Sequence, residues 1–239
     1  MKVVSFLFSL VALAVASVAL YFSTPKGLEK TLTEKPQILL NAGKSVEKAL
    51  QEEARAKQEE AARLAEETIS KNIEAFNNDA SSPFVGPEDA KVVVVEFFDF
   101  ACGYCHALAP TLESLVEAND DVKFVFKPLA FLSRDSAYAA SAFIAANMQG
   151  KAYDFYKNVM GINNGLSEEK INEAAQKAGV DLEQMKKDMD GKDVEAALRR
   201  TNELARQANI NGVPFLLFNG KIVHSFDQEE LQSEIDAAK

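Results

Sequence analysis

The chain of 239 residues has no tryptophan and few cysteines and histidines, the usual ligands of structural zinc. It has two cysteines and two histidines, whereas a structural zinc site needs four ligands. His106 is adjacent to Cys105 and His224 is far away in the sequence, so the spacing disfavours a zinc site. The net charge of −10 also argues against nucleic-acid binding, which needs a basic face.

The two cysteines lie close together, with Gly103 and Tyr104 between Cys102 and Cys105. They follow an apolar run at residues 92–98 and precede a helical pattern, which is typical of a dithiol redox site. A helix N-terminus directs N–H groups and a partial positive charge toward the first sulfur and stabilises its thiolate, the form that attacks disulfides. The alternative is a structural disulfide, but its loop is too short to add much stability.

The N-terminal segment indicates export from the cytoplasm. Residues 3–22 carry no charge and follow Lys2. Residues 14–16 have the small-x-small form of a signal cleavage site, but the apolar run continues to the length of about 20 residues that spans a bilayer. Segment 1–22 is therefore a cleaved signal peptide or a retained anchor, and either predicts a periplasmic or cell-envelope location. One close cysteine pair in an oxidising compartment fits an enzyme that acts on disulfides of other proteins.

Residues 24–79 form a second region, and from Lys44 to Phe76 it has no proline or glycine. Opposite charges at four-residue spacing favour an exposed helix. Lys57 interrupts a thin apolar stripe along this helix, which comprises Val46, Leu50, Ala54, Ala61, Leu64 or Ala65, Ile69, Ile73 and Phe76. The segment is either a solvated spacer or an oligomerisation stalk that buries the stripe in a homodimer or homotrimer. The stalk is favoured because the rest of the chain need not cover the stripe.

The third region, residues 84–239, predicts an α/β domain. We expect strands at 91–99, 121–127, 214–218 and 221–225, the last two joined by an Asn219-Gly220 hairpin turn. Helices are expected after the cysteine motif, in several pieces at 134–209, and at 227–238, with Asp227 as an N-cap. This order of elements predicts a small mixed sheet flanked by helices.

From residue 84 to 238 the sequence resembles the DsbA-like branch of the thioredoxin-fold dithiol oxidoreductases. Residues 94–105 and 212–215 carry the resemblance, and the long helical insertion fits the same branch. The resemblance implies a thioredoxin-like fold with a helical insertion, after the N-terminal helical stalk. It also implies a protein disulfide oxidoreductase or isomerase with a redox-active Cys102–Cys105 disulfide and no other cofactor or metal.

The matching positions imply a role for each residue of the site. Cys102 would be the exposed nucleophile and Cys105 the buried resolving thiol. Pro214 would be a cis-proline facing both sulfurs, a bond geometry that only proline readily tolerates. The cis turn would leave the carbonyl and N–H groups of Val213 free to bind an incoming peptide as an added strand.

Four further residues surround this core of the site. Glu96 matches a buried acid behind the second cysteine, so its pKa should be raised and it could exchange a proton with that thiol. Gly103 and Tyr104 would shape the surface on which substrates dock. His106 either tunes the thiolate of the first cysteine or is a solvated surface histidine.

The resemblance leaves the direction of electron flow open. The Gly-Tyr pair resembles the disulfide isomerases, whereas Val213 before Pro214 resembles the oxidase. The N-terminal extension resembles oligomeric DsbA-like proteins, some of them described as envelope or outer-membrane antigens. Implied partners are exported proteins with cysteines and a membrane redox partner that reoxidises or reduces the dithiol. The alternatives are a structural envelope protein with a vestigial dithiol, and a peroxide- or glutathione-dependent enzyme on the same fold.

Overall fold

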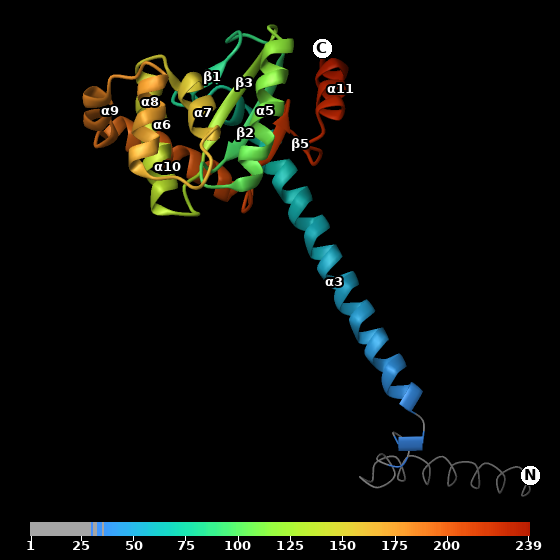
Figure 1. Ribbon diagram of the computed structural model, residues 1–239. Coiled ribbons are helices and arrows are strands. Elements are labelled where there is room, and N and C mark those ends of the chain that lie inside the picture. The colour runs from blue at the N-terminus through green and yellow to red at the C-terminus, as the bar shows by residue number, and fades with distance from the viewer. Residues whose placement is uncertain (1–29, 31–32, 35) are drawn as a thin grey trace, which may run out of the picture. The chain divides into compact units, whose positions relative to one another are not determined.

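The computed structural model describes residues 30, 33, 34 and 36–239 (Figure 1). The predicted signal or anchor at residues 1–22 lies outside the described residues. Among those described, no helix is long and apolar enough to cross a membrane. The chain divides into two compact units, with the boundary between Glu60 and Ala61.

The first unit contains most of helix α3, which spans Pro36–Lys71 and continues into the second unit. Proline suits the first turn of a helix, where its missing N–H has no helical partner. Exposed ion pairs at four-residue spacing follow, for example Lys57–Glu53 at 2.7 Å between Nζ and Oε1. Each such pair stabilises the helix by about 0.3 kcal/mol. The side chains of Val46 and Leu50 are exposed.

The second unit begins with the end of α3 and helix α4, Ile73–Asn77, and these residues cover one face of the sheet. Ile69 and Phe76 are fully buried, and the Phe76 ring packs edge-on against Phe97 with ring centroids 5.9 Å apart. We predicted that residues 84–239 leave the whole apolar stripe uncovered. This prediction is wrong for the C-terminal half of the stripe. Val46, Leu50 and Leu64 remain exposed, whereas Ala65 is buried and Ala61 is half-buried.

The sheet has five strands in the order β1-β3-β2-β4-β5. Central β2 pairs in parallel with β3 and antiparallel with β4, whereas β1 and β5 are antiparallel edge strands. Positive φ angles at Asn219 and Gly220 confirm the predicted hairpin turn between β4 and β5. The strands are β1 Phe84–Val85, β2 Val92–Phe98, β3 Val122–Pro128, β4 Phe215–Phe218 and β5 Lys221–Val223.

Helix α5 follows β2 directly, and five helices form the insertion between β3 and β4. In Figure 1, helices α6, α8 and α9 lie to the left of the sheet and α11 lies to its right, and buried residues of α6 and α11 belong to the same hydrophobic core. The side chain of Asp227 accepts hydrogen bonds from the first turn of α11, which confirms the predicted N-cap. The helices are α5 Gly103–Ala118, α6 Arg134–Met148, α7 Ala152–Met160, α8 Glu168–Lys177, α9 Leu182–Met189, α10 Lys192–Gln207 and α11 Gln228–Ala238.

Strand β2 contributes to two separate hydrophobic cores because successive side chains point to opposite faces. Val94 and Phe98 pack into the larger core with α5, α6 and α7. Val95 and Phe97 pack into the smaller core with the end of α3, α4 and α10. All seven residues of β2 are buried, and Glu96 shares the face of Val94 and Phe98. The strand therefore carries a carboxyl into the interior on the side of α5.

Candidate active site

The cysteine pair lies at the junction of β2 and α5. Cys102 is the N-cap of α5, with an extended backbone, and Cys105 lies in the first turn of the helix. Both are free thiols. Cys105 is fully buried, as expected, but Cys102 is only 7% exposed, so the expectation of an exposed nucleophile is wrong. In this reduced form the Cys102 side chain belongs to the larger core, whereas neighbouring Tyr104 is 78% exposed.

The Val213–Pro214 peptide bond is cis, as the sequence predicts. The thiol of Cys102 donates a hydrogen bond to the Val213 carbonyl oxygen, with 3.5 Å between Sγ and oxygen. The Val213 carbonyl is therefore occupied in this form, although we expected it to be free for a peptide. A thiol donates only while it keeps its proton, so ionisation or disulfide formation at Cys102 releases the carbonyl. Peptide binding at Val213 stays a prediction.

Glu96 is buried behind the cysteines, as expected. Burial raises its pKa to about 8, although the hydrogen bond from Tyr156 acts in the opposite direction. The Tyr156 hydroxyl donates to Glu96 Oε2 over 2.9 Å. Glu96 Oε1 is buried and has no hydrogen-bond partner among the described residues. A carboxyl with this pKa is mostly protonated at neutral pH, but a fraction of the molecules carries the ionised carboxylate.

Cys105 has the properties of a thiol that needs a proton acceptor. Burial raises its pKa far above the ordinary value, the Asp99 backbone hydrogen bond lowers it, and the negative charge of Glu96 raises it. Cys105 is therefore a neutral thiol at physiological pH, and it must lose its proton before it can attack a disulfide. The effect of the Glu96 charge on this pKa shows that the two groups lie within electrostatic range of each other, and proton exchange between them stays a prediction.

His106 is half-buried rather than fully solvated. Its Nε2 lies 2.7 Å from the carbonyl oxygen of Phe100, which can only accept, so Nε2 carries a proton and donates it. This bond ties the first turn of α5 to the segment that follows β2. The predicted effect of His106 on the Cys102 thiolate stays a prediction.

Asp99 is a site residue that the sequence interpretation missed. Its carboxylate is fully buried and accepts three backbone hydrogen bonds. Oδ1 accepts from Ala101 N at 2.8 Å, and Oδ2 accepts from Phe131 N and Leu132 N, both at 3.1 Å. One side chain therefore fixes the turn before Cys102 and the loop between β3 and α6. The signal in the sequence was an acidic residue between an apolar strand and the cysteine motif.

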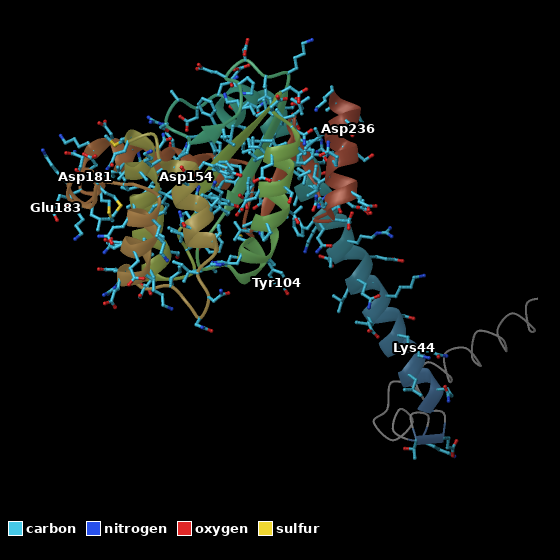
Figure 2. All side chains as sticks on the ribbon, turned by 45° about the horizontal axis from the view of Figure 1, so that its top comes forward. Lys44, Tyr104, Asp154, Asp181, Glu183 and Asp236 are labelled. Atoms are coloured by element: carbon cyan, nitrogen blue, oxygen red, sulfur yellow. The ribbon has the colours of Figure 1, made fainter. Side chains whose placement is uncertain are left out.

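The surface next to Val213 and Pro214 is hollowed. Residues 209–215, Tyr104 and Phe226 line a groove of about 440 Å³. Tyr104 lies at the surface of the second unit near the start of α5 (Figure 2). A Cβ atom added to Gly103 would meet no other atom within 4 Å, so the space in front of the motif is open. The groove therefore lies beside the Val213–Pro214 turn, whose carbonyl accepts the hydrogen bond of Cys102.

The described residues include no group of three or more histidine, cysteine, aspartate or glutamate side chains that could hold a metal ion. The chemistry available from the chain itself is thiol–disulfide exchange. The site brings together Cys102, Cys105, Glu96 and the Val213–Pro214 turn from β2, α5 and the start of β4.

Comparisons with known proteins agree with this chemistry. The sequence profile of the thioredoxin family matches residues 78–237. The probable disulfide bond formation protein D of Bacillus anthracis is 28% identical over 165 residues, which cover 64% of this chain and 76% of that protein. Both the family match and this relative support the DsbA-like interpretation of the sequence.

Solved structures give the same result. A thioredoxin-like oxidoreductase from Silicibacter pomeroyi DSS-3 is 33% identical and has a TM-score of 0.65. The alignment covers 70% of this chain and 97% of that protein. The catalytic domain of Proteus mirabilis ScsC is 27% identical and has a TM-score of 0.65. The alignment covers 72% of this chain and 97% of that domain. The chain belongs to the thioredoxin family and is a DsbA-like thiol–disulfide oxidoreductase.

Proposed function

We propose that this protein forms or reshuffles disulfides in exported proteins through Cys102 and Cys105. One observation carries the proposal. Two free thiols lie within one helical turn at the start of α5, and the second, Cys105, lies within electrostatic range of Glu96, a carboxyl with a pKa of about 8. This pairing suits a two-step exchange, because the first sulfur meets the substrate and the second needs a nearby group to exchange its proton.

In the oxidising direction, a substrate thiolate attacks Cys102 in the Cys102–Cys105 disulfide. The bond between the two enzyme sulfurs breaks, a mixed disulfide forms, and Cys105 leaves with the electron pair and takes a proton from Glu96. A second substrate thiolate then attacks the substrate sulfur of the mixed disulfide, Cys102 leaves as a thiolate with the electron pair, and the substrate is oxidised by two electrons. In the reducing direction the same steps run backwards, and Cys105 returns its proton to Glu96 as it attacks Cys102.

Ribonuclease A with all its cysteines reduced, and ribonuclease A with scrambled disulfides, separate the two directions. Oxidation of the first and recovery of active enzyme from the second are measured with wild type, Cys102→Ser and Cys105→Ser. We expect Cys102→Ser to lose both activities and Cys105→Ser to accumulate mixed disulfides, visible as a mass increase that a reductant reverses. Full activity of Cys102→Ser would refute the assignment of the nucleophile.

The same proposal includes assembly through the first unit. Leu40, Val46 and Leu50 are exposed in the first unit on α3, and burial of these apolar residues in a homodimer or homotrimer would remove them from water. A chain that begins at Ala61 keeps the residues that cover the sheet and is the appropriate truncation.

Sedimentation of residues 24–239 and 61–239 tests this assembly. We expect the longer chain to be oligomeric and the shorter one to be a folded monomer that retains dithiol oxidation and loses recovery of scrambled ribonuclease. Leu50→Glu should dissociate the longer chain, whereas Gln51→Glu at the exposed neighbouring position should not. If residues 24–239 sediment as a monomer, assembly through α3 is refuted and the helix is only a spacer.

The location is also part of the proposal. The apolar segment before the described residues supports delivery to the periplasm or cell envelope, where exported proteins with cysteines and a membrane redox partner would be met. Expression of the full chain in bacteria, followed by fractionation and protease protection, tests the location. Accumulation in the cytoplasm would contradict it.

A further inference from the structure

The two oxygens of the Glu96 carboxyl have different surroundings. Oε2 accepts the hydrogen bond of the Tyr156 hydroxyl at 2.9 Å, whereas Oε1 is buried with no partner among the described residues. Both side chains are almost completely inaccessible to water. The Tyr156 ring is fixed by rings on several sides, with its centroid 4.7 Å from that of Phe126 and 5.2 Å from that of Phe98. A ring held in this way keeps its hydroxyl directed at one oxygen.

Few other polar groups face this carboxyl. In the sheet, Glu96 lies between Phe126 of β3 and Leu216 of β4, which are apolar. Helix α7 provides Tyr156, and helix α5 provides Cys105, whose pKa Glu96 influences. Lys123 and Lys127 of β3 point to the face of the sheet opposite to that of Phe126, because successive side chains of a strand alternate between the two faces. There they donate hydrogen bonds to Asn78 and Ser82. Glu96 is therefore a carboxyl whose charge acts on Cys105, and Oε1 is its oxygen without a hydrogen-bond donor among the described residues.

We propose that Tyr156 is a positioning residue that reserves Oε1 of Glu96 for proton exchange with Cys105 by holding Oε2. This inference builds on the proposed role of Glu96 and adds a residue that acts through it. In the resolving step, the sulfur of Cys105 attacks the sulfur of Cys102 and forms the enzyme disulfide. The mixed disulfide breaks, the substrate sulfur leaves with the electron pair, and the proton of Cys105 passes to Oε1.

The hydroxyl of Tyr156 also favours the ionised carboxylate, which is the form that can accept this proton. Tyr156→Phe removes the donor and keeps the ring, so the ionised form becomes scarcer at neutral pH. A hydrogen bond to a charged group is worth about one pH unit or more. The variant should therefore resolve the mixed disulfide about tenfold more slowly at pH 7 and recover toward the wild-type rate at high pH.

The reaction of the reduced protein with 5,5′-dithiobis(2-nitrobenzoate) isolates the resolving step. Cys102 releases the first thionitrobenzoate at a rate that depends on reagent concentration, and the attack of Cys105 releases the second at a rate that does not. Stopped-flow absorbance from about pH 6 to pH 10 gives the pH midpoint of the second release. We expect the midpoint of Tyr156→Phe to lie about one unit above that of wild type.

Tyr153→Phe is the matched control. Tyr153 is on the same helix, and its ring stacks on Tyr156 at an interplanar angle of 11°, but its hydroxyl makes no described hydrogen bond to Glu96. This variant should leave the midpoint unchanged. If Tyr156→Phe slows the second release by the same factor at every pH, Tyr156 serves packing only and the inference is overturned.

Glu96→Gln separates this inference from the proposal on which it depends. The variant should flatten the pH profile of the second release, and Tyr156→Phe should then have no further effect on the midpoint. A profile of Glu96→Gln that matches wild type would overturn the role of Glu96 itself. A flattened profile for Glu96→Gln together with an unshifted midpoint for Tyr156→Phe would overturn the role of Tyr156 alone.

Discussion

Replacing Glu96 with glutamine is expected to stabilise the folded protein at neutral pH, by an amount that grows with pH. Burial raises the pKa of Glu96 from 4.5 to about 8 in the folded state. Between these two values the unfolded chain loses a proton that the folded protein keeps, so stability falls as the pH rises. The penalty is absent below about pH 4.5 and complete above about pH 8.

The size of the effect follows from the same two values. At pH 7 the unfolded side chain is ionised and the folded one is mostly protonated, so about 2.5 pH units at about 1.4 kcal/mol each give a penalty of about 3 kcal/mol. Glutamine resembles the protonated carboxyl, because its amide oxygen can still accept the bond from Tyr156. Glu96→Gln should therefore match wild type near pH 4 and exceed it by about 3 kcal/mol at pH 7.

Urea unfolding at pH 4, 7 and 8.5, in a non-thiol reductant, measures this difference. With a slope of about 2 kcal/mol per molar urea, the midpoint at pH 7 should rise by about 1.5 M. Glu173→Gln, at an exposed position on α8, should change stability by less than about 0.5 kcal/mol at each pH. A gap between wild type and Glu96→Gln that is the same at pH 4 and pH 7 would refute the reasoning, as would a more stable wild type at pH 7.

Two further substitutions test the packing around the site. Phe76→Ala should lower the free energy of unfolding in urea by about 3–5 kcal/mol, because the ring is fully buried against Phe97. Leu64→Ala on the exposed side of α3 should lower it by less than about 0.5 kcal/mol. Equal losses would contradict the conclusion that the end of α3 and α4 cover one face of the sheet. Asp99→Ala should cost about 2 kcal/mol or more and slow disulfide exchange with ribonuclease, because three backbone N–H groups lose their acceptor; an unchanged unfolding midpoint would show that water replaces the carboxylate.

Much of the fold could be predicted because its signals are local. The apolar run of β2, the Asn219-Gly220 turn and the Asp227 cap each depend on neighbouring residues, and all three are present. The cysteine motif could also be found, because it lies between an apolar strand and a helical pattern, and the family resemblance pointed to Glu96. Family resemblance added the cis peptide before Pro214, which no local pattern demands.

The remaining features depend on contacts between distant segments. Alternation in β3 indicates one covered face, yet Lys123 and Lys127 are also buried because the segment around α4 covers the second face and bonds to them. The stripe on α3 could not be divided into covered and exposed parts without knowing where the sheet lies. Tyr156 and Asp99 were missed for the same reason, since their partners are 60 and 32 or 33 residues away.

The two faces of β2 also determine how this protein can diverge. Glu96 lies on the face of the cysteine site, and Phe97, one peptide bond away, packs against Phe76 of α4 on the other face. Substitutions on one face leave the packing of the other intact, so a lineage can change reactivity and attachment independently. Insertion or deletion of a single residue would exchange the two faces and destroy both properties at once. Libraries for directed evolution can therefore randomise alternate positions of this strand and select separately for each property.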